Sequence, residues 1–205
     1  MLARPMFFEF PTDNGTHAFT RQFMFGPHLL VVPGTMLRAS SKLVKAYFPR
    51  GVWYEPHRGH RIQSLGQTIF VPESKHSVAP FFARAGSIVP RAIAGGIRLQ
   101  VFLDDGEQAA GDLFQLPPKE PELEALVTNN YSLFHFFYVK GALTGHCSPC
   151  AVKTSLSCIT LYGLKRRPSV VEINGRLLPF NTTDRLLIAK GVNHDATSPF
   201  LITVS

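Results

Sequence analysis

Short apolar runs, each closed by proline or glycine, recur along the first half of the 205-residue chain. They are Leu29–Pro33, Leu43–Pro49, Thr68–Pro72 and Ser87–Pro90. Such runs, about ten to twenty residues apart and separated by turn-forming residues, are typical of β-sandwich strands. The pattern therefore predicts an all-β fold, and a hydrophobic content of 45% is enough for a substantial core.

The second half continues the pattern with longer runs. Residues Ile97–Leu103 alternate between apolar and polar types and are followed by an Asp105-Gly106 turn signal. A polar, proline-rich stretch over 115–129 predicts a loop. Further strands are expected at Tyr131–Val139, Leu156–Leu161, Ser169–Ile173, Leu186–Ala189 and Phe200–Val204. A helix is expected over Thr16–Phe25, where Phe19 and Phe23 are four residues apart.

The net charge of +7 raises the question of nucleic-acid binding. The densest basic groups, His57–Arg61 and Lys165–Arg167, are short and about a hundred residues apart in sequence, and neither lies in an aromatic RNA-recognition pattern. We therefore expect no nucleic-acid partner. The chain also lacks an apolar stretch of the roughly 18 residues that a membrane span needs, so no membrane span is expected.

Several segments, in order and at suitable spacing, resemble the C-terminal region of glycoside hydrolase family 31, the family of α-glucosidases. The Tyr47–Tyr54 segment resembles a family strand and turn, and Phe82–Pro90 resembles a second family motif with arginine, glycine and proline at fixed positions. The other segments that carry the resemblance are Arg4–Pro11, Gln22–Pro33, Leu161–Leu164, Val171–Gly175 and Pro199–Ile202.

The resemblance implies three parts. Residues 1–25 would be the last strand and helix of a (β/α)8 barrel, 26–94 a proximal β-sandwich and 95–205 a distal β-sandwich. Family members are retaining enzymes, which need two carboxyl groups about 5 Å apart. In the family both come from barrel strands that precede the segments matched here, so we expect no catalytic or substrate-binding residue in this chain and no activity of the chain alone. The implied partner is the barrel domain, and the implied substrate of the whole enzyme is a sugar with terminal α-linked glucose.

Two acidic positions are candidate sites. Glu9 lies in the segment that resembles a barrel strand, but the family motifs place neither catalytic carboxylate there, so a structural hydrogen bond is the favoured interpretation. Residues Asp104–Glu107 resemble part of a calcium loop, yet they lack the EF-hand spacing, and a turn explains them. No metal and no cofactor are expected.

Three cysteines lie close together in sequence. Cys147, Cys150 and Cys158, with His146, have the composition of a Cys₃His zinc site, although a single C-x-x-C is a weak signal. The alternative is a disulfide from Cys147 or Cys150 to Cys158, which leaves one free thiol and suits an oxidising compartment. The family resemblance implies no zinc here, so the disulfide is favoured.

Three N-glycosylation sequons begin at Asn14, Asn130 and Asn181. They fit a protein of the secretory pathway, as the lysosomal, intestinal and endoplasmic-reticulum members of the family are. The first residues, however, do not form a signal peptide. Loss of an upstream part of the protein would reconcile the two observations, and the localisation of the chain itself is left open.

Two other interpretations remain. The chain could be a free carbohydrate-binding module that uses Trp53, Tyr54 and the aromatics of 134–138, although these residues are also what a core needs. It could also fold poorly, because Phe7, Phe8 and Phe10 would belong to a barrel strand without neighbours.

Overall fold

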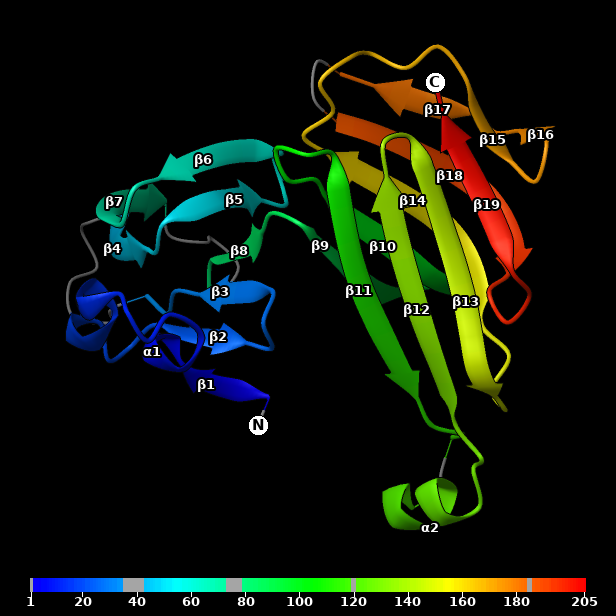
Figure 1. Ribbon diagram of the computed structural model, residues 1–205, viewed down its shortest axis with the longest axis horizontal. Coiled ribbons are helices and arrows are strands. Elements are labelled where there is room, and N and C mark those ends of the chain that lie inside the picture. Colours follow the sequence, from blue (N-terminus) through cyan, green and yellow to red (C-terminus); the bar gives the residue numbers. More distant parts are fainter. Residues whose placement is uncertain (1, 35–42, 73–78, 119–120, 184–185) are drawn as a thin grey trace. The chain divides into compact units, whose positions relative to one another are not determined.

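The computed structural model describes residues 2–34, 43–72, 79–118, 121–183 and 186–205. The described chain is built almost entirely of β-strands, which confirms the all-β prediction (Figure 1). It divides into two compact units, 1–85 and 86–205. The division into three parts at 25/26 and 94/95 stays a prediction.

The first unit contains a six-stranded antiparallel sheet and a two-stranded ribbon. The sheet has the order β1-β2-β3-β8-β5-β6, and the ribbon pairs β4 with β7. These strands are β1 (Ala3–Pro5), β2 (Phe23–Phe25), β3 (Leu29–Val31), β4 (Leu43–Phe48), β5 (Gly51–Glu55), β6 (His60–Ser64), β7 (Gln67–Pro72) and β8 (Phe81–Arg84).

One hydrophobic core joins the ribbon to the sheet. The buried side of β4 contributes Val44, Ala46 and Phe48, because alternate residues of a strand point to one face. The Phe48 ring meets the Phe82 ring of β8 edge to face, with centroids 4.8 Å apart. Trp53 lies in the same core, and its indole N–H donates to the Pro49 carbonyl at 2.9 Å.

The N-terminal segment differs from the expected strand and helix. The expected strand over Arg4–Pro11 is limited to β1, because the chain turns at Pro5 into the short helix α1 (Met6–Glu9). The expected helix over Thr16–Phe25 is wrong. Asp13 caps a 3₁₀ turn, η1 (Asn14–Ala18), by accepting from the Gly15 N–H, and the chain then enters β2.

The second unit forms one eleven-stranded sheet that folds over on itself as a sandwich (Figure 1). Its order is β16-β15-β19-β13-β12-β11-β9-β10-β14-β18-β17. The strands are β9 (Ser87–Ile93), β10 (Gly96–Phe102), β11 (Gln108–Gln115), β12 (Ser132–Val139), β13 (Ala142–Cys150), β14 (Ser155–Tyr162), β15 (Val171–Ile173), β16 (Arg176–Leu177), β17 (Phe180–Thr182), β18 (Leu186–Asp195) and β19 (Phe200–Val204). The green to red strands β11, β12, β13 and β19 form one layer in Figure 1, with β10, β14 and β18 behind it.

The core of this sandwich comes from the inward positions of both layers. Phe134, Phe136 and Tyr138 alternate on β12, while Leu99 and Val101 alternate on β10. The expected loop over 115–129 contains a short helix, α2 (Glu122–Val127), which starts after Pro121 and ends where the Thr128 hydroxyl donates to the Glu124 carbonyl. None of the described helices is long and apolar enough to cross a membrane.

The two units meet in sequence without a spacer. The Ala85 N–H donates to Val52 O of the first unit at 2.9 Å. The next N–H, that of Gly86, donates to Phe102 O of the second unit at 2.7 Å.

Candidate functional site

The N-terminal segment of the first unit carries an exposed apolar surface, here called the N-terminal apolar surface and formed by Leu2, Phe7, Phe8 and Phe25. These side chains are 64%, 38%, 63% and 42% exposed, respectively. The Phe7 ring stacks between the rings of Phe8 and His17, with centroids 5.1 Å apart in both cases. The rings of Phe7 and Phe8 are therefore stacked on the exposed side of α1 and are not buried in the core.

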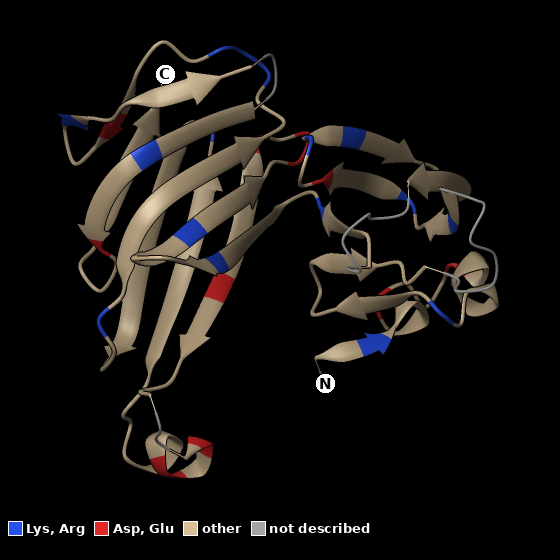
Figure 2. Cartoon of the chain, turned by 180° about the vertical axis from the view of Figure 1, so that it is seen from behind, with Lys and Arg blue, Asp and Glu red and all other residues tan. Residues whose placement is uncertain are grey.

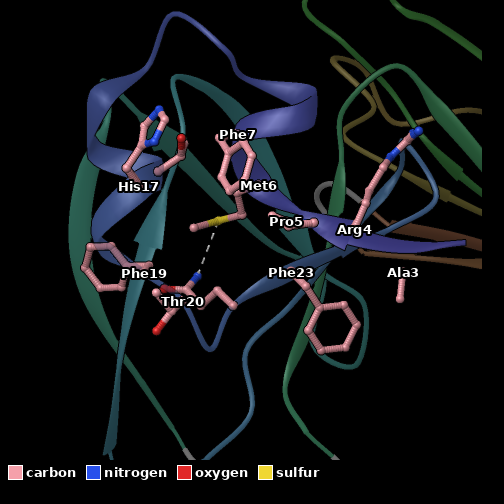
Figure 3. A pocket seen from close by; sticks show the side chains of 11 residues that line it. Ala3, Arg4, Pro5, Met6, Phe7, His17, Phe19, Thr20 and Phe23 are labelled. Carbon is pink, nitrogen blue, oxygen red and sulfur yellow. Dashed lines mark hydrogen bonds between the residues drawn. The ribbon is translucent and has the colours of Figure 1, made fainter. Parts of the chain in front are cut away.

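A pocket of about 310 Å³ lies beside this surface. Its lining comes from β1, α1, η1 and the start of β2, with Met6 at its base and Phe7, His17, Phe19 and Phe23 around it (Figure 3). The lining is mainly apolar. Such a mainly apolar pocket can accept apolar side chains of another protein segment.

A buried polar bridge holds the floor of the pocket in place. Gln22 is almost fully buried, and its amide N–H donates to the Tyr47 carbonyl at 3.0 Å while its carbonyl oxygen accepts from the Tyr47 N–H at 2.7 Å. Met6 Sδ lies 4.0 Å from the same Gln22 nitrogen (Figure 3). The pocket is therefore anchored to the β4–β7 ribbon.

Glu9 is engaged in ion pairs. Its carboxylate pairs with Arg4 of β1 and lies 3.9 Å from the Arg84 guanidinium of β8. Arg84 also lies over the Phe10 ring, 4.9 Å from its centroid. These contacts tie the N-terminal segment to the sheet and give Glu9 a structural role.

The acidic turn after β10 is held by its own hydrogen bonds. Asp104 Oδ1 accepts from the N–H groups of Gly106 at 2.8 Å and Gln108 at 2.9 Å. Across the described part of the chain, no group of three or more His, Cys, Asp or Glu side chains is placed to hold a metal ion.

The cysteine pairing differs from the expected one. Cys147 and Cys150 of β13 form a disulfide, and Cys158 is a buried free thiol on β14. Strand β14 pairs with β10 and β18 and not with β13, so Cys158 is not the partner. His146 is exposed on β13 whereas the adjacent Cys147 is buried, so the imidazole and the Cys147 side chain lie on opposite faces of the strand.

The proposed sugar-binding aromatics are mostly core residues. Trp53, Tyr54, Phe134, Phe136 and Tyr138 are all buried, so they offer no face to a sugar ring. Within the 134–138 stretch, Phe137 is exposed. Asn14, Asn130 and Asn181 are also exposed, on η1, after α2 and on β17, respectively.

Charged residues form no continuous stripe among the described strands. Lysine and arginine are dispersed over both units, and α2 carries the acidic pair Glu122 and Glu124 (Figure 2). This distribution gives no support to a nucleic-acid interface.

Known proteins resemble this chain in both sequence and fold. Residues 1–89 match the model of the "Glycosyl hydrolase family 31 C-terminal domain". Lysosomal alpha-glucosidase of Rattus norvegicus is 27% identical over 204 residues, an alignment that covers 85% of this chain and 21% of that protein. Intestinal sucrase-isomaltase of the same species is 26% identical over 229 residues, covering 98% of this chain and 12% of that protein.

A solved structure with the same fold is the family 31 dextranase of Flavobacterium johnsoniae. It superposes with a TM-score of 0.75 at 14% identity and covers all of this chain and 29% of that one. The chain thus spans about a fifth or less of the length of the two curated relatives. Residues 1–89 are thus similar to the C-terminal domain of glycoside hydrolase family 31, and the chain as a whole shares the fold of the corresponding part of the dextranase.

Proposed function

We propose that this chain is the non-catalytic C-terminal part of a family 31 α-glucosidase and that its first unit docks on the catalytic barrel. The whole enzyme would hydrolyse terminal α-linked glucose. The catalytic carboxyl pair of a retaining glycosidase would come from the barrel, so the chain alone would have no activity.

The observation that carries the proposal is the N-terminal apolar surface. Four large exposed apolar side chains and a mainly apolar pocket belong to the segment that begins the family match. Several large exposed apolar groups on one segment are typical of an interaction surface. Packing against a barrel would remove Leu2, Phe7, Phe8 and Phe25 from water.

The surroundings of Glu9 favour a docking role over a catalytic one. The Glu9 carboxylate pairs with Arg4 and lies 3.9 Å from the Arg84 guanidinium, so it is oriented toward cationic groups of its own unit. These ion pairs engage the carboxylate in holding the N-terminal segment.

The test is binding to a family 31 catalytic barrel from which the corresponding C-terminal region has been deleted. Purified chain is titrated against this barrel by calorimetry, and hydrolysis of a chromogenic α-glucoside is followed for the barrel, the chain and their mixture. We expect no turnover by the chain alone, binding to the barrel, and higher activity of the mixture.

Phe8→Ser should weaken this binding at least tenfold, because it removes a large apolar contact from the surface. Phe70→Ser is the matched control: Phe70 lies on β7 of the same unit and is 65% exposed, against 63% for Phe8. Equal loss of binding in both variants would contradict the proposed surface. Turnover by the chain alone would contradict its non-catalytic role.

A further inference from the structure

The outer face of the second unit brings together two histidines from the consecutive strands β12 and β13. Strands β11, β12 and β13 are neighbours, and their register places Asp112 opposite His135 and His135 opposite His146. The residues on either side of these positions, such as Gly111, Phe134 and Cys147, point to the core, so all three side chains lie on the outer face.

Asp112 fixes the ring of His135. Asp112 Oδ1 lies 2.6 Å from His135 Nδ1. A carboxylate oxygen accepts hydrogen bonds, so Nδ1 is the donor of this contact, and in a neutral imidazole Nε2 is then the nitrogen with a free lone pair. A histidine oriented by a carboxylate in this way is the common arrangement of a metal-binding imidazole.

His146 is in position to supply a second nitrogen. Directly opposite residues on antiparallel strands have Cβ atoms about 4.5–5.5 Å apart. Two imidazole nitrogens that bind one tetrahedral zinc ion, at about 2.0–2.1 Å each, are separated by roughly 3.3 Å. With His135 held by Asp112, rotation of the exposed His146 side chain would have to bring one of its ring nitrogens to this separation from His135 Nε2.

We propose that His135 and His146 form a two-histidine site for a borderline divalent transition metal such as Zn²⁺, with Asp112 as the positioning residue. With two protein nitrogens, the remaining coordination positions are open to water or to a ligand from a partner. The site lies on the outer face of β12 and β13 in the second unit and shares no residue with the N-terminal apolar surface, so the proposal does not rest on the proposed docking.

The experiment is calorimetric titration of the tag-free chain with ZnCl₂. One ion should bind per chain, and His135→Ala or His146→Ala should each abolish the binding. His57 and His60, in the first unit, are the other histidines that lie near each other in sequence. The double variant His57→Ala/His60→Ala is therefore the matched control and should bind like wild type.

Asp112→Asn should weaken binding by about 10-fold to 100-fold, as expected for loss of a carboxylate that orients a ligating histidine. The ¹⁵N chemical shifts of the His135 ring should show a proton on Nδ1 in the wild type and a mixture of tautomers in Asp112→Asn. These shifts respond to the tautomer, whereas a merely structural role of Asp112 would leave them unchanged.

Zinc binding that survives both His135→Ala and His146→Ala, or that disappears in the His57→Ala/His60→Ala variant, would overturn the site. So would the absence of zinc binding to a folded wild-type chain. Unchanged affinity and unchanged ring shifts in Asp112→Asn would overturn the positioning role. Circular-dichroism melts of each variant show that a loss of binding is not a loss of fold.

Discussion

The Gln22 side chain pairs with the backbone of Tyr47 on strand β4, whose only strand neighbour among the described residues is β7. Its side-chain amide makes two hydrogen bonds to the backbone N–H and C=O of Tyr47, as a paired strand would. Both groups are buried, so neither could turn to water if the amide were absent.

Gln22→Leu should therefore lower the free energy of unfolding of the first unit by about 2–4 kcal/mol, since it leaves two buried backbone groups unsatisfied. Urea unfolding followed by Trp53 fluorescence measures this, because Trp53 lies in the core of that unit. Gln63→Leu, at an exposed position of β6, should change the stability by less than about 0.5 kcal/mol. Similar losses in both variants would refute the bridge.

The stability of both units should fall between pH 10 and pH 12. The pKa of Tyr47 is raised to about 12, mainly by burial. The hydrogen bond that its hydroxyl donates to Asp13 and the negative charge of Asp13 also contribute to this rise of the pKa. Burial and the charge of Glu107 raise the pKa of Tyr138 to about 12 as well. An unfolded tyrosine has a pKa of about 10, so the unfolded chain releases protons first, and stability that is complete below pH 10 is lost as the pH approaches 12.

Tyr47→Phe should reduce the loss of stability between pH 10 and pH 12 for the first unit. Tyr138→Phe should reduce the same loss for the second unit. The measurement is the urea midpoint of each variant at intervals from pH 9 to pH 12. Slopes that match the wild type in both variants would mean that other groups cause the alkaline loss.

Cys158 should be unreactive in the folded protein. It is a buried residue on a central strand, β14, while the other two cysteines are joined in a disulfide. Ellman titration without reductant should find no fast thiol in buffer and one thiol per chain in guanidinium chloride. Three thiols in guanidinium would show that the disulfide is absent.

Reduction of the disulfide should lower the free energy of unfolding by only about 2 kcal/mol, since the disulfide closes a very short loop.

The three sequons should carry glycans when the chain is secreted from a eukaryotic host. Asn14, Asn130 and Asn181 are all exposed, so a glycan at each would extend into solvent. Treatment with an N-glycanase should reduce the mass by three glycans, and each Asn→Gln variant should lack one. Asn129→Gln, next to Asn130 but outside a sequon, is the matched control and should retain all three.

The strands that could be predicted from sequence are those with uninterrupted apolar patterns. Residues of β4, β10, β12, β14 and β19 were identified from these patterns alone. The strands β11 and β13 were not, because Gly111, Gly145 and Pro149 look like turn residues. In the structure both glycines lie where another part of the chain comes close to the backbone. A Cβ on Gly111 would lie 2.0 Å from Ile88 O, and one on Gly145 would lie 2.1 Å from the Phe200 ring.

The candidate sites were harder to predict from the sequence than the strands, because pairing between strands decides which side chains lie together. The exposure of Phe7 and Phe8 was expected from their place in a strand without neighbours, and both are exposed, although on a helix and not a strand. The proximity of Asp112, His135 and His146 could not be read from the sequence, because it arises from the register of three strands. Alternation along β13 places His146 on the face opposite to Cys147, its neighbour in sequence.

The junction at Ala85 and Gly86 has a consequence for how the chain can be cut. Proteases cleave segments that can leave their hydrogen bonds and enter an extended active-site cleft. Here the last amide of one unit and the first amide of the next are both bonded within their own units. Digestion of the folded chain should therefore not begin at this boundary, and limited proteolysis should not release the two units as separate fragments.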